Sequence, residues 1–205
     1  MEDLQRLFEI SSRDHNHLCP RQILGVRIGL KGICSLQLEP NRGSKRLLVI
    51  TETNGCFADG LSAATNCTVG HRTLHVEDCG KAAATFIDTQ TRRSIRVAPM
   101  LDIRERASVF ALDEPRHYFA QMQAYQVMPD EEMMTVQEVF LNTSIEWIIS
   151  HPGLRVNCNV CGEEIMNERE VMQEGLTLCR TCAGDGYYQT DMKCSFENGF
   201  LSLAR

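Results

Sequence analysis

The sequence predicts an α+β fold: a core of mixed helix and mainly antiparallel sheet, followed by a small C-terminal zinc-ribbon domain. Two observations support this prediction. Helical and strand patterns alternate along the first 150 residues, and two Cys-x-x-Cys pairs stand 17 residues apart near the C-terminus. A chain of 205 residues can form one medium domain and one small one. We therefore expect a core domain over residues 1–150 and a zinc-ribbon domain over residues 151–205.

Two helices are expected before the first strand. The opening stretch, residues 1–10, is acidic and amphipathic, unlike the basic and apolar start of a signal peptide. A second helix is expected from Pro20, which the first turn of a helix accepts, through Ile23, Val26 and Leu30. No apolar run approaches the roughly 18 residues that a membrane span needs. We therefore expect a cytoplasmic protein with no membrane partner.

The following segments predict strands around one short helix. Apolar alternation at Leu36 and Leu38 and the β-rich run 47–51 predict a hairpin, because a turn with Pro, Asn and Gly lies between them. The remaining expected elements are a helix over residues 57–65, a strand within 73–78, a hairpin from 85–88 and 94–97, helices within 105–110 and 114–127, a strand or helix at 136–141, and a linker at 150–157.

The cysteines near the C-terminus predict a structural zinc site. The chain has ten cysteines, and a reducing cytosol disfavours structural disulfides. Cys158 and Cys161 form one close pair and Cys179 and Cys182 another, so that all four thiolates can converge on one tetrahedral ion. A redox dithiol pair is the alternative. Four thiolates close the coordination sphere of Zn²⁺, so no catalysis is expected at this ion.

The charge of the chain argues against nucleic acid as a partner. The net charge is -6, and residues 151–205 hold five basic and eight acidic side chains. Phosphate contacts require a surplus of Lys and Arg on one face. We therefore expect the ribbon to pack against protein or to bind a protein partner.

The segment DHNHLCP, residues 14–20, is a second candidate for metal chemistry. In an extended segment His15, His17 and Cys19 would share one face. Imidazole and thiolate both bind zinc, iron and other transition metals. The alternative is that His15 is simply exposed next to Asp14 and that Cys19 is a small buried apolar side chain.

Cys56 is the strongest single candidate in the core for a ligand or nucleophile. It stands at an expected helix N-terminus, where unpaired amides favour a thiolate. Asp59, one turn later, can orient a ligand or accept a proton, and Lys81 follows a glycine at a turn and can meet an anionic group. A solvated carboxylate and a surface lysine are the ordinary alternatives. Cys67 is expected to be buried, and the cysteines taken as structural thiols are Cys34, Cys79 and Cys194.

Several of these stretches together resemble the FmdE family, named for a component of formylmethanofuran dehydrogenase. They are HNHLCP, GVRIG, ETNGCFADGLSAATNCTVG, TLHVEDCGKAAATF and RSIRV, and the C-terminal CNVCGEE and GLTLCRTCAGDGYY resemble the zinc-finger tail of many members. The resemblance implies an α+β core, a homodimer and a His/Cys cluster that forms a metal or active site. The corresponding positions in this chain are His17, Cys19, Cys56, Asp59, Cys67 and Lys81.

Two positions depart from the family pattern. Arg21 follows the Cys-Pro pair where the family usually has glycine, which adds bulk and a cation beside the expected site. Asn66 stands where the family usually has glycine before Cys67, and asparagine tolerates a left-handed backbone.

The sequence therefore predicts a metal-binding protein with two metal sites. The zinc ribbon is structural, and a second transition metal in the core is held by His17, Cys19 and Cys56. Asp59 or Lys81 would handle protons or an anionic substrate there. The resemblance extends this to a role in molybdenum- or tungsten-enzyme metabolism, as a protein partner of such an enzyme system. The alternative is an interaction or regulatory protein without catalysis, whose only metal is the ribbon zinc.

Overall fold

The computed structural model describes residues 4–41, 43–149, 153–188, 194–197 and 200–203. It has two compact units, residues 1–142 and 143–205. The boundary predicted between residues 150 and 151 lies outside the described residues. The first unit combines helices with a mainly antiparallel sheet, and the second is a small module built mostly of short hairpins. The predicted α+β fold class is therefore confirmed. Within the described ranges, no helix combines the length and apolarity that crossing a bilayer requires.

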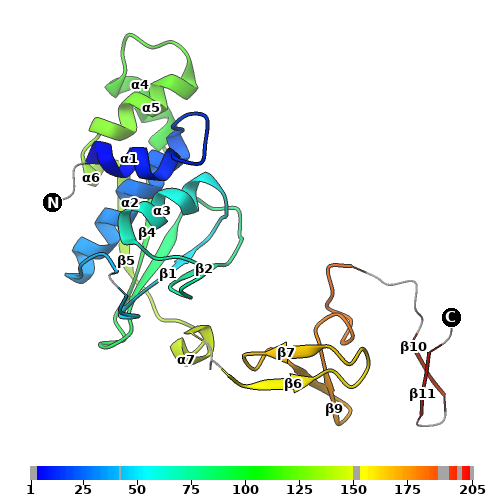
Figure 1. Cartoon of the computed structure of the whole chain (residues 1–205). Helices are drawn as coiled ribbons and strands as arrows, with labels where there is room; N and C mark the ends of the chain where they lie inside the picture. Colours follow the sequence, from blue (N-terminus) through cyan, green and yellow to red (C-terminus); the bar gives the residue numbers. More distant parts are fainter. Residues whose placement is uncertain (1–3, 42, 150–152, 189–193, 198–199, 204–205) are drawn as a thin grey trace. The chain divides into compact units, whose positions relative to one another are not determined.

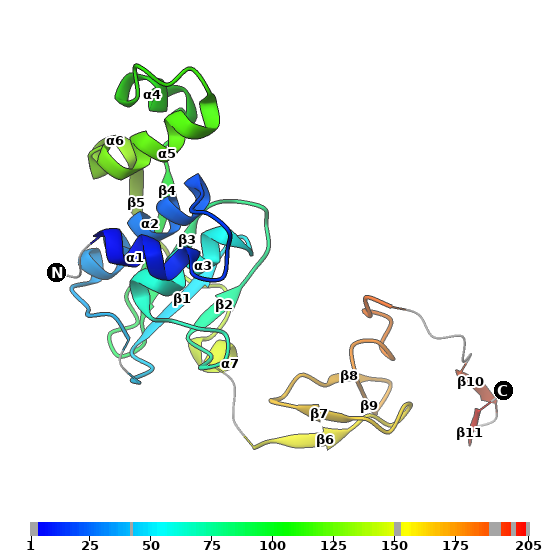
Figure 2. The same cartoon turned by 45° about the horizontal axis from the view of Figure 1, so that its top comes forward.

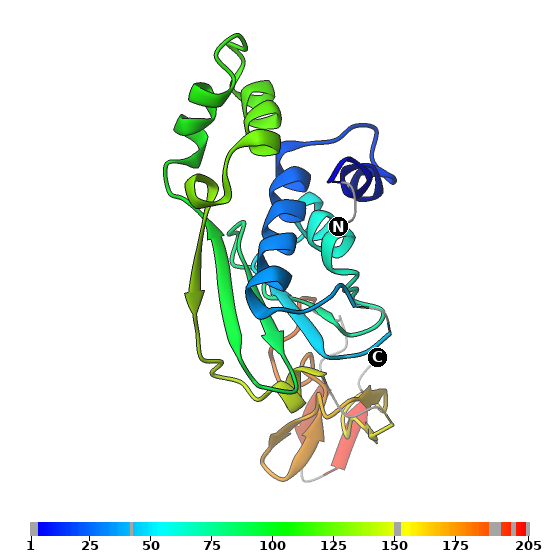
Figure 3. The same ribbon diagram turned by 90° about the vertical axis from the view of Figure 1, so that its left-hand side faces the viewer.

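The first unit places its first three helices on one face of a five-stranded sheet (Figure 3). Its helices are α1 (Leu4–Ser12), α2 (Pro20–Leu36), α3 (Cys56–Thr65), α4 (Ile103–Phe110), α5 (His117–Val127) and α6 (Asp130–Met133). Figure 3 shows α2, in blue, between the sheet and the pair α1 and α3, while α4 and α5 form a hairpin beyond one end of the sheet. The core is therefore built between α2 and the strands, and α3 packs on the outer side of α2.

The sheet is mainly antiparallel. Its strands are β1 (Leu47–Thr51), β2 (Leu74–Val76), β3 (Ala84–Asp88), β4 (Ser94–Pro99) and β5 (Met134–Glu138). They lie in the order β2-β1-β3-β4-β5, and only the pair β1 and β2 is parallel. The structure confirms the predicted short helix, the strand within 73–78 and the hairpin of β3 and β4. The segment near 136–141, which the sequence left ambiguous, contributes residues to β5.

The hairpin predicted around residues 36–51 is wrong. Helix α2 continues through Leu36 because Ile33 and Leu36, one turn apart, are both buried against the core. The helix ends at Gln37, whose backbone is left-handed with φ 56°. Strand β1 pairs instead with β2 and β3, so the apolar residues near the end of α2 serve a helix face and not a strand.

Helices α2 and α3 approach each other so closely that only glycine fits at their crossing. A methyl group at Gly60 would lie 2.3 Å from the carbonyl oxygen of Gln22, and one at Gly25 would lie 2.3 Å from that of Phe57. This contact brings the start of α2 beside the first turns of α3, as Figure 2 also shows. Cys19, the residue before α2, lies beside Cys56, the first residue of α3, at this crossing.

The second unit holds short antiparallel hairpins. Its elements are α7 (Ile145–Ile149), β6 (Arg155–Asn157), β7 (Glu164–Met166), β8 (Val171–Gln173), β9 (Leu176–Leu178), β10 (Cys194–Glu197) and β11 (Phe200–Leu203), labelled in Figures 1 and 2. The pairs are β6 with β7, β8 with β9 and β10 with β11. The linker predicted at 150–157 is wrong at its end, because residues 155–157 pair with β7; residues 150–152 lie outside the described ranges.

Candidate metal sites

The four C-terminal cysteines converge on one point in the second unit. Cys158 and Cys161 lie in the turn between β6 and β7, and Cys179 and Cys182 follow β9. One ligand atom of each lies within 4.8 Å of those of the other three, and the Sγ atoms of Cys161 and Cys179 are 3.9 Å apart. The small cluster around them contains only three buried residues, Cys158, Ile165 and Leu178. Such a small core depends on a metal for its stability.

Backbone amides around these cysteines are arranged to stabilise thiolates. The Cys179 amide donates to the Cys158 sulfur at 3.3 Å, and the Cys182 amide to the Cys179 sulfur at 3.4 Å. Burial alone raises the pKa of Cys158, but amide hydrogen bonds outweigh it and lower this pKa to about 6. Gly162, with φ 77°, directly follows Cys161 and allows the chain to turn there. The geometry is that of a structural tetrathiolate zinc site.

A second cluster lies in the first unit and contains one imidazole, one thiol and one carboxylate. His15, Cys56 and Asp59 each offer a ligand atom within 4.8 Å of those of the other two. His15 lies in the loop between α1 and α2, and Cys56 and Asp59 occupy the first turn of α3. Nε2 of His15 is 2.9 Å from Oδ2 of Asp59. Asp59 can therefore act as a ligand itself or orient the ring of His15, as carboxylates do beside metal-bound histidines.

Cys19 places a second thiol next to Cys56, beside this cluster. The pKa of Cys56 is raised, first by burial and then by the hydrogen bond and charge of Cys19 and by the charge of Asp59. These effects outweigh the backbone contribution that lowers the pKa of Cys56, so the thiolate expected from the helix N-terminus is not favoured in the metal-free chain. Cys19 and Cys56 are both half-buried. The two thiols and the carboxylate would repel one another when ionised, a repulsion that a cation relieves.

The structure separates two predicted site residues from this cluster. His17 is exposed and is not among the three groups that converge. Residues 13–17 form turns and bends, so the alternation of an extended segment does not hold there. Lys81 is exposed and lies beside Glu52, because its backbone amide donates to the Glu52 carbonyl at 3.1 Å. The pKa of Glu52 is lowered first by its hydrogen bond with Arg96, with Lys81 as a smaller contribution.

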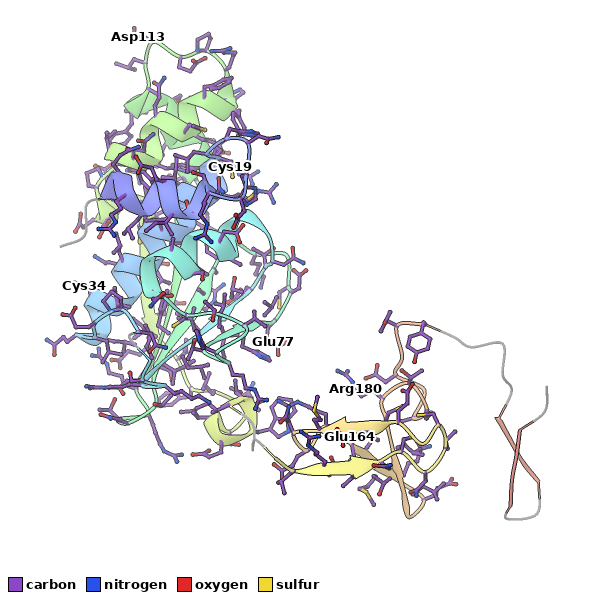
Figure 4. All side chains as sticks on the ribbon, in the orientation of Figure 1. Cys19, Cys34, Glu77, Asp113, Glu164 and Arg180 are labelled. Carbon is purple, nitrogen blue, oxygen red and sulfur yellow. The ribbon has the colours of Figure 1, made fainter. Side chains whose placement is uncertain are left out.

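The other cysteines differ in their surroundings. Cys67 is fully buried, as expected, and its thiol donates to the carbonyl of Leu47 at 3.6 Å. Cys34 and Cys79 are exposed. Figure 4 shows Cys19 and Cys34 toward opposite ends of α2, so Cys34 lies away from the cluster. The side chain of Cys194 lies outside the described part of the chain.

Two of the three cluster residues, His15 and Asp59 but not Cys56, border a broad surface groove. The groove has a volume of about 1770 Å³ and extends over α1, α2, α3, the chain after α2 and the segment that joins α5 to α6. The side chains of His15 and Asp59 are 35% and 46% exposed. An ion pair at this exposure adds at most about 1 kcal/mol to stability.

The chain matches two families along its length. Residues 15–150 match the family described as FmdE, Molybdenum formylmethanofuran dehydrogenase operon. Residues 153–188 match the family described as Prokaryotic dksA/traR C4-type zinc finger. The second match contains all four cysteines of the tetrathiolate cluster, and the first contains His15, Cys19, Cys56 and Asp59.

Two individual proteins are similar to the chain over most of its length. A protein of Archaeoglobus fulgidus named "Probable S-adenosyl-L-methionine-binding protein" is 28% identical over 90% of the chain, and the chain spans about half (54%) of that relative. The crystal structure of a protein of Syntrophus aciditrophicus described as "tungsten formylmethanofuran dehydrogenase subunit e (fmde)-like" matches with a TM-score of 0.61 and 20% identity, covering 91% of this chain and 95% of that one. The latter likeness establishes a shared fold.

Proposed function

The chain belongs to the FmdE family and carries a C4-type zinc finger, and we propose that its core binds a second, transition-metal ion between His15, Cys56 and Asp59. The observation that supports this most strongly is the convergence of three different metal-binding groups within 4.8 Å. The function proposed is therefore that of a metal-binding protein with one structural zinc and one accessible core ion.

The donor set of the core cluster suits such an ion. Zn–S and Zn–N bonds of about 2.3 and 2.0–2.1 Å place tetrahedral ligands about 3.5 Å apart, so small side-chain adjustments bring these three groups onto one ion. Cys19 lies beside Cys56 and is a candidate for the third protein ligand if Asp59 instead orients His15, so that a fourth position stays open. A mixed set of nitrogen, sulfur and oxygen donors favours zinc or iron over magnesium or calcium.

The groove gives the core ion a role that the zinc finger cannot have. A transition metal with an open position supplies Lewis-acid chemistry to a bound ligand. In the proposed site, Cys56 and His15 hold the ion, and Asp59 either joins them or holds the imidazole of His15 in place. This proposed ligand set does not need His17. Lys81 stays a prediction as an anion-binding group.

We also propose a homodimer that serves a molybdenum or tungsten enzyme system in the cytoplasm. The link to such an enzyme system is supported by the description of the matching family, which refers to a molybdenum formylmethanofuran dehydrogenase operon. Light scattering of the purified chain distinguishes a monomer of 23.2 kDa from a dimer. Size-exclusion chromatography with a purified molybdenum or tungsten formylmethanofuran dehydrogenase tests the association directly.

The core ion is tested by counting metals per chain. Elemental analysis is done on anaerobically purified wild type, on His15→Ala/Cys56→Ser and on His17→Ala. We expect two ions in the wild type, one in the double variant and two in His17→Ala, because His17 is exposed and outside the described cluster.

Other counts lead to other conclusions. One zinc in all three proteins would remove the core ion and leave an interaction or regulatory protein with a structural zinc finger. A loss of the second ion in His17→Ala would restore His17 as a ligand and require the loop between α1 and α2 to rearrange when metal binds.

A further inference from the structure

Gln22 is an unusual residue to find in the core of the first unit. Its side chain is fully buried, although glutamine is among the residues most often exposed. A buried amide is costly unless its donor and acceptor both find partners. Gln22 meets this requirement with two hydrogen bonds of 2.8 Å, and both go to the ends of a single loop.

These two hydrogen bonds close the loop that carries His15. The Nε2 group of Gln22 donates to the carbonyl oxygen of Ser11, near the end of α1. The amide of Cys19 donates to Oε1 of Gln22, the arrangement of a capping box at the start of α2. One side chain therefore fixes both the point where the loop leaves α1 and the point where it enters α2.

The backbone of Gln22 is also seated against the helix that carries the remaining ligands. Its carbonyl oxygen is the nearest atom to the position that a methyl group on Gly60 would take, at 2.3 Å. Gly60 directly follows Asp59 and lies one turn after Cys56. Gln22 thus contacts the loop of His15, the residue Cys19 and the ligand-bearing part of α3.

We propose that Gln22 is a positioning residue of the core metal site, which holds His15 and Cys19 in register with Cys56 and Asp59. This inference rests on the proposed function. The exposed residues 13–17 form turns and bends, and their position depends on how the loop ends are held. Without the two hydrogen bonds, the ion would have to order the loop itself, and the cost of ordering would be subtracted from the binding free energy.

The test compares Gln22→Met with Asp88→Asn. Methionine keeps the length and much of the volume of glutamine but loses both hydrogen bonds. Asp88 is equally a buried polar residue, 3% exposed, but it lies at the end of β3 that pairs with Leu47, the start of β1. It therefore controls for a general loss of stability. Each protein is loaded with zinc in the finger and titrated with Co²⁺ in competition with a chelator, and the visible absorption of bound Co²⁺ is recorded.

We expect the dissociation constant of core Co²⁺ to rise about 10- to 100-fold in Gln22→Met, as is typical when a group that orients metal ligands is lost. The Co²⁺ spectrum should also change, because the ligand geometry is less well defined. Asp88→Asn should keep the wild-type affinity and spectrum. If the wild type binds core Co²⁺ and Gln22→Met binds it equally well, or if both variants bind it more weakly to the same extent, the positioning role of Gln22 is overturned and the core metal site stands. A wild type that binds no core Co²⁺ overturns the core-metal proposal and this inference with it.

Discussion

Replacing Gly60 by alanine is the sharpest structural test of how the core site is assembled. The added methyl group would lie 2.3 Å from the Gln22 carbonyl oxygen, 2.8 Å from the Val26 amide nitrogen and 2.9 Å from Cα of Gly25. All three are backbone atoms, so no side chain can rotate away. Since real Cβ atoms essentially never come within 3.0 Å of a neighbour, α2 and α3 must separate by roughly 0.7 Å or more.

The energetic cost follows from two opposing effects. Overpacking of this kind costs about 1–3 kcal/mol, and backbone neighbours place Gly60→Ala at the upper end. Alanine is favoured over glycine in a helix by about 1 kcal/mol, which leaves a net loss of about 2 kcal/mol. For a chain of this size, that loss lowers the melting temperature by about 4–8 °C.

Thermal unfolding followed by far-UV circular dichroism measures this change, with zinc kept in the finger. Gly70→Ala is the matched control, because a methyl group there meets no atom within 4 Å and the backbone is not left-handed. We expect Gly70→Ala to stay within about 0.5 kcal/mol of the wild type. Gly60→Ala should also weaken core metal binding, since it moves Cys56 relative to Cys19. Equal stability of the two variants would refute the close approach of α2 and α3.

Three further predictions concern other parts of the chain. The hydrogen bonds of Arg46 and, to a smaller extent, of nearby backbone amides outweigh burial and lower the pKa of Asp88 from 3.8 to about 2. The ionised Asp88 therefore contributes about 2 kcal/mol to the free energy of unfolding. This contribution is complete above about pH 4 and is lost as the pH falls through 2. Urea unfolding of Asp88→Asn should show a smaller loss of stability over this interval; an identical pH dependence would contradict it. Chelation of the finger zinc should shift the fluorescence of Trp147, the single tryptophan, because the Arg169 guanidinium stacks 4.1 Å from its ring; unchanged emission after loss of zinc would show that this contact does not depend on the metal. Gly55→Ala should cost about 1–3 kcal/mol in chemical denaturation and weaken core metal binding, because the backbone of Gly55 (φ 69°, ψ -149°) is open almost only to glycine; wild-type stability would exclude that strain.

Much of the fold follows from local patterns in the sequence. The predicted hairpin of β3 and β4 is confirmed. It was predictable because both strands have a strongly biased composition and a polar turn lies between them. The end of α2 was not predictable in the same way. Leu36 and Leu38 alternate as strand residues do, and only the packing of Ile33 and Leu36 against the core selects the helix.

The spacing of residues along the sequence is enough to predict the zinc site but not the core cluster. Two close cysteine pairs need only local turns to converge, and the structure brings them together. The core cluster depends on where α2 and α3 cross, which short-range patterns do not encode. The sequence therefore singled out Cys56 and Asp59 but left His15 outside the predicted ligand set. Gln22 was missed, although a glutamine three residues after Cys19 is the spacing of a capping box.

X-ray absorption at the zinc edge tests the central claim most directly, because it reports the donor atoms around every bound zinc. The measurement is made on wild type loaded with excess zinc and then desalted. We predict two shells, sulfur at about 2.3 Å from the finger and the core cysteines, and nitrogen or oxygen at about 2.0–2.1 Å from His15 and Asp59. The His15→Ala/Cys56→Ser variant should retain sulfur alone. A pure sulfur shell with one zinc per chain in the wild type would contradict the core metal site.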